Sequence, residues 1–297
     1  MIQSLVSLTG YRLLLLAAAF LFSTGGAAIK ACSLTSWQIA CFRSGIAALS
    51  VALLLPEARR IWRPRIFIVG VAYAGTLIFF VLANKLTTSA QAIFLQATSP
   101  LYLLLLAPLV LHERIRRSQL LMMSVVAAGA LLLLFGEQRV AATAPDPLRG
   151  NWLGVLSGVS WALTLTGFRW MGKHGGDLES PVAVVVTGNI IAFFACLPMA
   201  LPVHSATPVD VGVLLYLGIV QLGLGCLLLT RAARHVPAVE AATLLLLEPV
   251  LNPLWTWLLQ GERLSPTTLC GATLIVCALS TLTLYQGRRG RRDMSPS

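Results

Sequence analysis

The chain has 297 residues, of which 57% are hydrophobic and only 11% are charged. An ordinary soluble domain carries about 25% charged residues, so this chain has too few to cover a water-facing surface. One helical span of a bilayer needs roughly 20 apolar residues. Short loops therefore leave room for ten spans in this length. The composition predicts an all-α polytopic membrane protein and excludes a soluble enzyme tethered to a membrane.

Basic residues outnumber acidic residues by 22 to 11, which gives a formal net charge of +11. Membrane proteins keep Lys and Arg in their cytoplasmic loops, so this excess follows from topology and requires no anionic partner. No basic stripe with interleaved aromatic residues is present, and we expect no nucleic-acid partner. The six cysteines are scattered without a C-x-x-C pair, which is typical of packing residues and of neither a disulfide framework nor a metal site.

Ten apolar runs follow one another along the chain, separated by charged residues or by Gly and Pro clusters. They lie near residues 11–30, 35–55, 65–84, 88–111, 118–136, 150–170, 181–201, 209–231, 237–259 and 265–286. The first run, behind Arg12, could be a secretory signal. Its weakly basic start and its length favour a retained first helix instead.

Lys and Arg are distributed unequally between loops that alternate from one side of the predicted bundle to the other. If the N-terminus faces the cytoplasm, 16 of them fall on the inner side and five on the outer side, while Arg43 lies inside a span. Cytoplasmic loops carry the excess of positive charge. The sequence therefore predicts a multi-pass protein of the inner (plasma) membrane with both termini in the cytoplasm.

An internal repeat relates each residue to the one 149 positions later, and it pairs residue types that are scarce in this chain: Pro100 with Pro249, Glu113 with Glu262, and Arg114 with Arg263. Each half has five spans. Because five is odd, the second half must insert upside down, which gives two inverted five-helix repeats around a central cavity. The predicted units are a first repeat (1–136), an external linker (137–149), a second repeat (150–287) and a basic cytoplasmic tail (288–297).

Two related motifs end the fourth and ninth spans. The first is Pro100 followed by His112-Glu113-Arg114-Ile115, and the second is Glu248-Pro249-Val250 followed by Gly261-Glu262-Arg263-Leu264. With these motifs the sequence resembles the EamA-type branch of the drug/metabolite transporter superfamily over nearly the whole chain. The first copy departs from the usual Gly-Glu-Arg at His112. Arg43-Ser44 also resembles the arginine that the family often has in its second span. The resemblance implies a secondary-active permease whose relatives carry amino acids, other small metabolites or organic cations.

Glu248 lies near the middle of the ninth span, where an ionised side chain costs at least about 2.5–3.5 kcal/mol. On a helical wheel it shares a stripe with Asn252 and Trp255. Such a stripe is typical of a cavity lining and makes Glu248 a candidate for proton coupling. The alternative is a structural carboxyl that is hydrogen-bonded to a neighbouring helix.

Arg43 lies about two turns inside the second span, on a face with small residues. Two interpretations stay open: a structural clamp on backbone carbonyls, or a partner for Glu248 or a substrate carboxylate. Gln91 is a further candidate lining residue for substrate binding or coupling, and both it and its repeat mate Glu240 lie nearer the span starts. We expect Glu240 to be an interfacial charge that pairs with Arg234 or His235.

Pro100 and Pro249 fall at equivalent places in the middle of their spans, where each removes a backbone hydrogen bond. Bent helices at corresponding positions of two halves mark the midplane site of a transporter, although a packing kink would use proline in the same way. Further candidate lining residues share faces of the third and sixth spans, where core packing is the alternative. They are Tyr73 and Phe80 in the third span, and Trp161 and Thr164 in the sixth.

Catalytic and phosphate-binding motifs are absent, and the four histidines fall at loops or span ends. We therefore expect no enzyme, no cofactor and no metal. The expected function is a permease that exports amino acids or related small metabolites, with a small-molecule substrate, the lipid bilayer and protons as partners. The alternatives are a multidrug or organic-cation exporter of the same fold, an intramembrane enzyme, and a non-transporting scaffold or channel subunit. Nothing in the sequence indicates the oligomeric state.

The charge distribution generates a topology prediction. Reporter proteins fused after Arg60, after Arg117 or within residues 288–292 should report the cytoplasm, because these segments carry the positive charge. A reporter in the loop that holds Pro145 should report the outside. Two of these fusions on the wrong side would contradict the span count and the inverted repeat.

Overall fold

The computed structural model describes residues 8–59, 63–111, 117–136, 140–174, 180–233 and 235–293. Within these residues the secondary structure is helical, apart from an isolated bridge between Ala141 and Ala144. The prediction of an all-α protein is confirmed.

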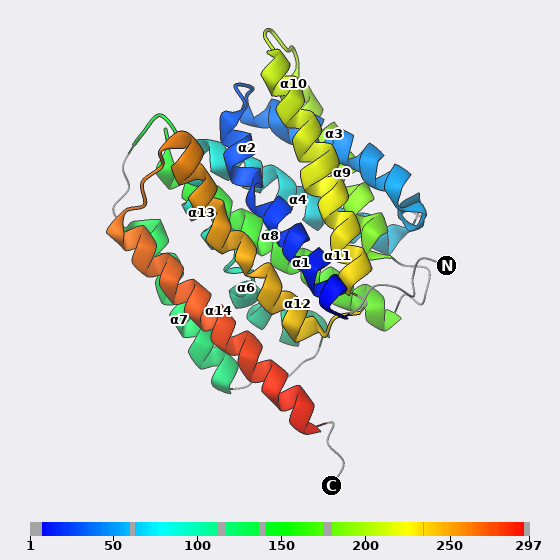
Figure 1. Ribbon diagram of the computed structural model, residues 1–297, viewed down its shortest axis with the longest axis vertical. Helices are drawn as coiled ribbons and strands as arrows, with labels where there is room; N and C mark the ends of the chain where they lie inside the picture. The colour runs from blue at the N-terminus through cyan, green and yellow to red at the C-terminus, as the bar shows by residue number, and fades with distance from the viewer. Residues whose placement is uncertain are drawn as a thin grey trace.

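Figure 1 shows the helices, which include a 3₁₀ segment (η1) and two π-helical segments (η2 and η4). In chain order they are α1 (Leu8–Ser23), α2 (Gly25–Ala31), α3 (Ser36–Leu54), η1 (Pro56–Arg59), α4 (Pro64–Leu86), α5 (Ser89–Gln96), α6 (Ser99–Leu106), η2 (Ala107–Leu111), α7 (Arg117–Phe135), α8 (Pro147–His174), α9 (Pro181–Ala200), α10 (Pro208–Leu215), η4 (Tyr216–Leu224), α11 (Gly225–Ala233), α12 (Ala238–Leu245), α13 (Leu247–Gln260) and α14 (Pro266–Asp293).

Local sequence signals explain where several helices begin and end. Thr35 accepts a hydrogen bond from the backbone of Gln38, whose side chain bonds back, and this capping box starts α3. Thr207 and Asp210 form the same arrangement at the start of α10. Gly261 ends α13 with a φ of 68°, a left-handed conformation that glycine adopts without a steric penalty.

Within the described residues, eight helical segments are long and apolar enough to cross a membrane, whereas the sequence predicts ten spans. The difference lies in two expected spans. Residues 119–135 form a shorter apolar helix, and α8 is long enough at 28 residues but is diluted by Gly, Ser and Thr. The count of ten is therefore not confirmed. The eight segments are Leu8–Ala31, Ser36–Leu54, Pro64–Leu86, Ser89–Val110, Pro181–Ala200, Pro208–Ala232, Glu240–Gln260 and Pro266–Leu284.

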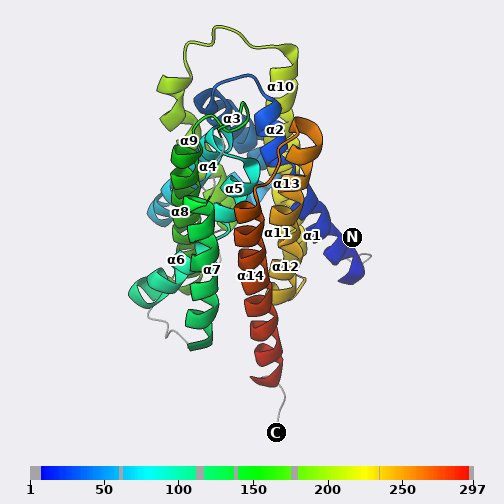
Figure 2. The same cartoon turned by 90° about the vertical axis from the view of Figure 1, so that its left-hand side faces the viewer.

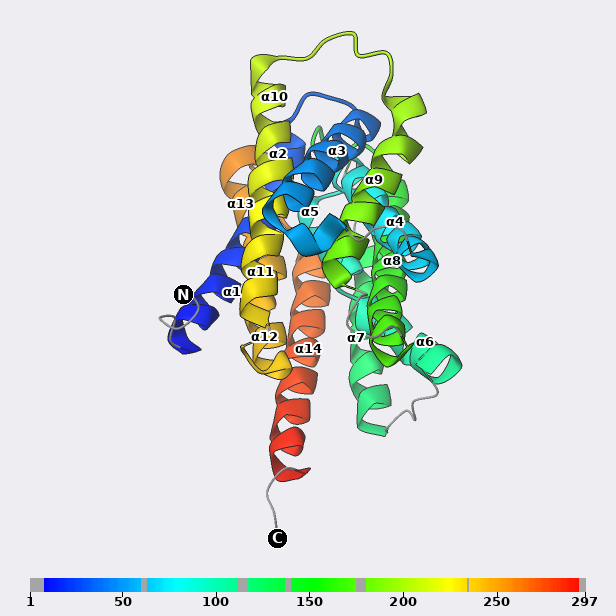
Figure 3. The same cartoon turned by 90° about the vertical axis from the view of Figure 1, so that its right-hand side faces the viewer.

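Helices from the two halves of the chain are interleaved. Helix α8 packs against α4 and α5, α3 packs against α9 and η4, and α1 packs against α11, α12 and α13. Helices α7 and α14 lie side by side in Figures 1 and 2. The first turn of α1 and the last turn of α14 lie toward the lower end in Figures 2 and 3, which we call the termini end. Residues 201–207, which connect α9 to α10, lie at the opposite end. We call this end the linker end.

Gly26 allows α2 to approach two helices of the core. A Cβ atom at this position would lie 1.8 Å from Ser89 Oγ and 2.9 Å from the side-chain amide of Asn252. Gly212 offers a contrast, because a Cβ there would meet nothing within 4 Å.

Gly26→Ala should therefore lower the midpoint of thermal unfolding of the purified protein, because overpacking a tight core costs about 1–3 kcal/mol. Gly212→Ala is the matched control and should be neutral or mildly stabilising, since alanine favours helix over glycine. Adding Ser89→Gly to Gly26→Ala should recover part of the loss. Equal midpoints for the Gly26 and Gly212 variants would refute the predicted clash.

Candidate functional site

In the described part of the chain, three spanning segments are interrupted within the bundle. Helix α5 ends at Gln96 and α6 begins at Ser99, while α12 ends at Leu245 and α13 begins at Leu247. Pro100 and Pro249 lie just after these two breaks, because a proline ring clashes with the carbonyl four residues earlier and cannot donate to it. The third break separates α1 from α2 at Thr24 and contains no proline.

Glu248 lies in the first turn of α13 because the break precedes it. The amino end of a helix carries partial positive charge, which favours a carboxylate there. Its side chain is partly exposed and forms no hydrogen bond or ion pair within the described part of the chain. In this state, therefore, Glu248 is not hydrogen-bonded to a neighbouring helix of the described residues, as the structural alternative requires.

Asn252 and Trp255, which share the predicted stripe with Glu248, both bond to other helices of the bundle. Asn252 is fully buried and its Oδ1 accepts a hydrogen bond from Ser89 Oγ at 2.6 Å. Trp255 donates its Nε1–H to Ser23 Oγ at 2.9 Å. These contacts tie α13 to α1 and α5.

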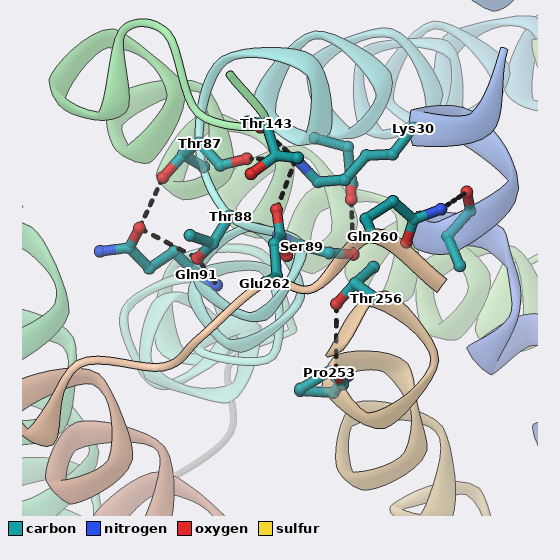
Figure 4. A network of polar contacts seen from close by, with 12 residues as sticks. Lys30, Thr87, Thr88, Ser89, Gln91, Thr143, Pro253, Thr256, Gln260 and Glu262 are labelled. Carbon is teal, nitrogen blue, oxygen red and sulfur yellow. Dashed lines mark hydrogen bonds and ion pairs between the residues drawn. The ribbon is translucent and has the colours of Figure 1, made fainter. Parts of the chain in front are cut away.

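An ion pair is buried at the linker end. Lys30 Nζ lies 2.8 Å from Glu262 Oε1, and the two side chains are 3% and 2% exposed. Lys30 also donates to the backbone carbonyls of Thr87 and Thr143, as Figure 4 shows. Glu262 Oε2 accepts the backbone N–H of Ser89 at 3.0 Å, at the amino end of α5. This pair joins α2, α5, the segment before α8 that holds Thr143, and the segment after α13.

Buried neutral groups extend this network to one side. Thr87 Oγ1 lies 2.7 Å from both Gln91 Oε1 and Asn151 Oδ1, and Asn151 Nδ2 donates to the carbonyl of Leu133. Gln91, a predicted lining residue, is 4% exposed and takes part in this linker-end network (Figure 4). On the other side Gln260 Nε2 donates to the carbonyl of Ala27 at 3.0 Å. Each side chain in the network bonds to at least one partner from another element.

Sequence reasoning missed the ion pair. It placed Lys30 among the charges of the outer loops and treated Glu262 only as part of a motif. The two residues are 232 positions apart, so no local pattern links them. The recurrence of the Glu at position 262 in the repeat was the available signal.

Arg43 lies on α3 with a side chain that is 2% exposed. Its Nε has no hydrogen-bond partner, and it forms no ion pair with an acidic residue in the described ranges. Glu248 and Arg43 therefore do not pair in this state. The electrostatic neighbours of Arg43 include the Tyr73 side chain on α4.

The remaining predicted lining residues divide into two groups. The ring of Tyr73 lies 6.2 Å from that of Trp161, between centroids, so the two aromatic faces do meet. Phe80 packs in the main hydrophobic core and is 9% exposed. Thr164 is fully buried and its hydroxyl donates to the carbonyl of Ser160 within α8. Phe80 and Thr164 thus have packing roles in this state.

Glu240 pairs with a residue that the sequence did not indicate. Arg12 Nη2 donates to Glu240 Oε2 at 3.2 Å, and the side chains are 42% and 31% exposed. His235 instead stacks on Tyr11, with ring centroids 3.9 Å apart. Arg234 lies outside the described residues. The pairing of Glu240 joins α12 to α1, which the sequence separation of 228 concealed.

The cysteines whose positions the structure describes are all free, including Cys32. Among those residues, no group of three His, Cys, Asp or Glu side chains could hold a metal ion.

Apolar spanning helices, interrupted in the middle of the bundle and interleaved between two halves, define a multi-pass membrane protein. The chain belongs to the EamA-like transporter family, which matches it twice, over residues 9–135 and 148–284. It is similar to the pseudopaline exporter CntI of Pseudomonas aeruginosa strain UCBPP-PA14, with 30% identity over 91% of this chain and 95% of that protein. It is also similar to the uncharacterized transporter YwfM of Bacillus subtilis strain 168, with 25% identity over 92% and 93% of the two chains.

A crystal structure of another protein matches 97% of this chain and 99% of that chain, with a TM-score of 0.62. The sequence identity is 19%, so this likeness shows a shared fold alone.

Proposed function

We propose that this protein is a secondary-active permease that exports amino acids or related small metabolites by alternating access. The observation that carries the proposal is the double match to the EamA-like transporter family, which covers both halves of the chain. Similarity to a pseudopaline exporter over nearly the full length supports export of a small metabolite.

The proposed architecture is ten spans in two inverted five-helix repeats, with both termini on the cytoplasmic side of the inner membrane. The contacts support it, because they recur after a shift of 149 residues. Helix α1 packs against α11, and the equivalent α8 packs against α4; α3 packs against η4, and the equivalent α9 packs against α4. Helices α7 and α8 supply the two remaining spans. In this topology the linker end faces the outside.

Alternating access requires that one end close while the other opens. The buried network around Lys30 and Glu262 supports assigning the described state as closed at the linker end. Glu248 and Trp255, nearer the middle, stay partly exposed. The breaks before α6 and α13 provide the points at which helices bend between states.

The function is tested by measuring flux of radiolabelled amino acids and organic cations in proteoliposomes. We expect saturable amino-acid flux that responds to a proton gradient. Glu248→Gln should still insert and fold, because it keeps shape and hydrogen-bonding capacity, but it should lose the pH dependence of flux and most gradient-driven accumulation. Glu240→Gln is the control, since it removes a partly exposed carboxylate, paired with Arg12, eight residues earlier.

Three results would count against these assignments. Absence of flux for every solute would favour a scaffold. Flux of organic cations alone would favour the multidrug alternative. Normal pH dependence in folded Glu248→Gln would remove Glu248 from coupling.

The closed linker end predicts how Cys32 reacts. Cys32 is 1% exposed, and its burial raises the pKa of its thiol to about 11. In a variant that keeps Cys32 as its only cysteine, Glu262→Gln should speed labelling by an impermeant maleimide by roughly tenfold or more. Without the Glu262 carboxylate Lys30 is unpaired in a dry site, which favours opening of this end. Opening hydrates Cys32 and lowers the pKa of its thiol, and each pKa unit changes the thiolate fraction about tenfold.

Arg149→Gln is the matched control at the same end. It breaks an ion pair with Asp146 in which Arg149 is 82% exposed, and such pairs contribute little to stability. Labelling of Cys32 should stay at the parent rate in this variant. Equal rates in the Glu262 and Arg149 variants would contradict closure by the buried pair.

A further inference from the structure

The guanidinium of Arg43 is a buried cation without an anion. Its side chain is 2% exposed, its Nε is unpartnered, and it forms no ion pair in the described part of the chain. Buried charges in proteins are paired, because burial removes the hydration of an ion and only a partner of opposite charge compensates for that loss. Among the described residues, no backbone carbonyl accepts a hydrogen bond from the Arg43 side chain either. The described part of the chain therefore supplies no counter-ion for Arg43 in this state.

Neutral polar groups with unused hydrogen-bonding capacity lie on the helices around Arg43. Helix α9 packs against both α3 and α4. It places Cys196 among the electrostatic neighbours of Arg43, and Asn189 beside Tyr73. Three buried oxygen atoms on α3 and α9 have no hydrogen-bond partner: Ser44 Oγ, Thr187 Oγ1 and Asn189 Oδ1. Such orphaned atoms are rare in native proteins and each requires an explanation.

We propose that Arg43 anchors the carboxylate of the transported solute, at a site formed by α3, α4 and α9. A guanidinium presents two parallel N–H donors that match a carboxylate, and the hydroxyls of Ser44 and Thr187 are further donors. Asn189 Oδ1 accepts from a donor on the same solute, such as the ammonium of an amino acid. The proposal rests on the proposed function only in calling the ligand a transported solute.

The aromatic pair beside this site suits the rest of such a solute. Tyr73 is 7% exposed and Trp161, on α8, is partly exposed. Their rings meet at 6.2 Å and 51°. Rings at this distance present an apolar wall next to the charged anchor. The site therefore selects an amphipathic carboxylate over an organic cation, which Arg43 would repel.

The first test measures binding and needs no transport. Thermal unfolding of the purified protein is followed with benzoate and L-phenylalanine, each compared with its own amide. Each carboxylate should bind roughly tenfold tighter than its amide or better, because hydrogen bonds between charged groups exceed neutral ones in strength. Arg43→Gln should abolish the difference and Arg43→Lys should weaken it. No stabilisation by either carboxylate, or equal stabilisation by the amides, overturns the proposal.

The second test supplies the missing anion within the protein and is independent of ligand identity. Cys196→Asp places a carboxylate beside Arg43, so it should raise the unfolding midpoint and abolish stabilisation by added carboxylates. Ala183→Asp is the matched control, because Ala183 is also buried on α9 but lies 13 residues before Cys196, about 20 Å along the helix. It should lower the midpoint. If both variants lose stability equally, Arg43 needs no anion and the proposal fails.

The two proposals can fail separately. Carboxylate binding without flux would retain the Arg43 site and reject the permease. Flux that ignores the carboxylate, with the same rates for an acid and its amide, would retain the permease and reject the site.

Discussion

The hydrocarbon core of a bilayer offers no hydrogen bonds, so a break in a spanning helix must satisfy its backbone groups from within the protein. Threonine hydroxyls do this at two of the breaks. Thr24 donates to the carbonyl of Leu21 at 2.7 Å, and Thr98 donates to the carbonyl of Leu95 at 2.6 Å. Each hydroxyl bonds to a carbonyl in the last turn of the helix before the break. The chain can therefore bend without leaving that carbonyl unpaired. Interrupted helices can then carry a site in the middle of the bundle.

The same constraint separates the two buried cations by role. Lys30 is surrounded by a carboxylate and two carbonyls, so its charge is compensated and it holds elements together. Arg43 is equally buried but has neighbours that are neutral. A compensated charge stabilises the arrangement it sits in, whereas an uncompensated one favours whatever brings it an anion. We therefore read the linker end as a closure and the Arg43 region as a place for a ligand.

Features encoded within one helix were predictable from the sequence, and features that join distant segments were not. The period of an α-helix put Asn252 and Trp255 on one face, and both do bond to other helices, Asn252 to Ser89 of α5 and Trp255 to Ser23 of α1. The prolines marked two of the three breaks because their effect is local. Glu240 was given a nearby partner, since proximity in sequence was the only information at hand, yet it pairs with Arg12 on the neighbouring helix α1, 228 positions away. The assignment of Glu248 and Arg43 to substrate binding or coupling stays a prediction.

A buried ion pair suits the proposed gate because its contribution to stability is a small difference between large terms. The attraction of Lys30 and Glu262 in a dry site is offset by the hydration that both lose there. When the linker end opens and water reaches both charges at once, that hydration is recovered, so opening costs little. Separating the pair while one member stays dry would cost far more. A gate of this kind favours complete opening or complete closure over states in between, which is what alternating access requires.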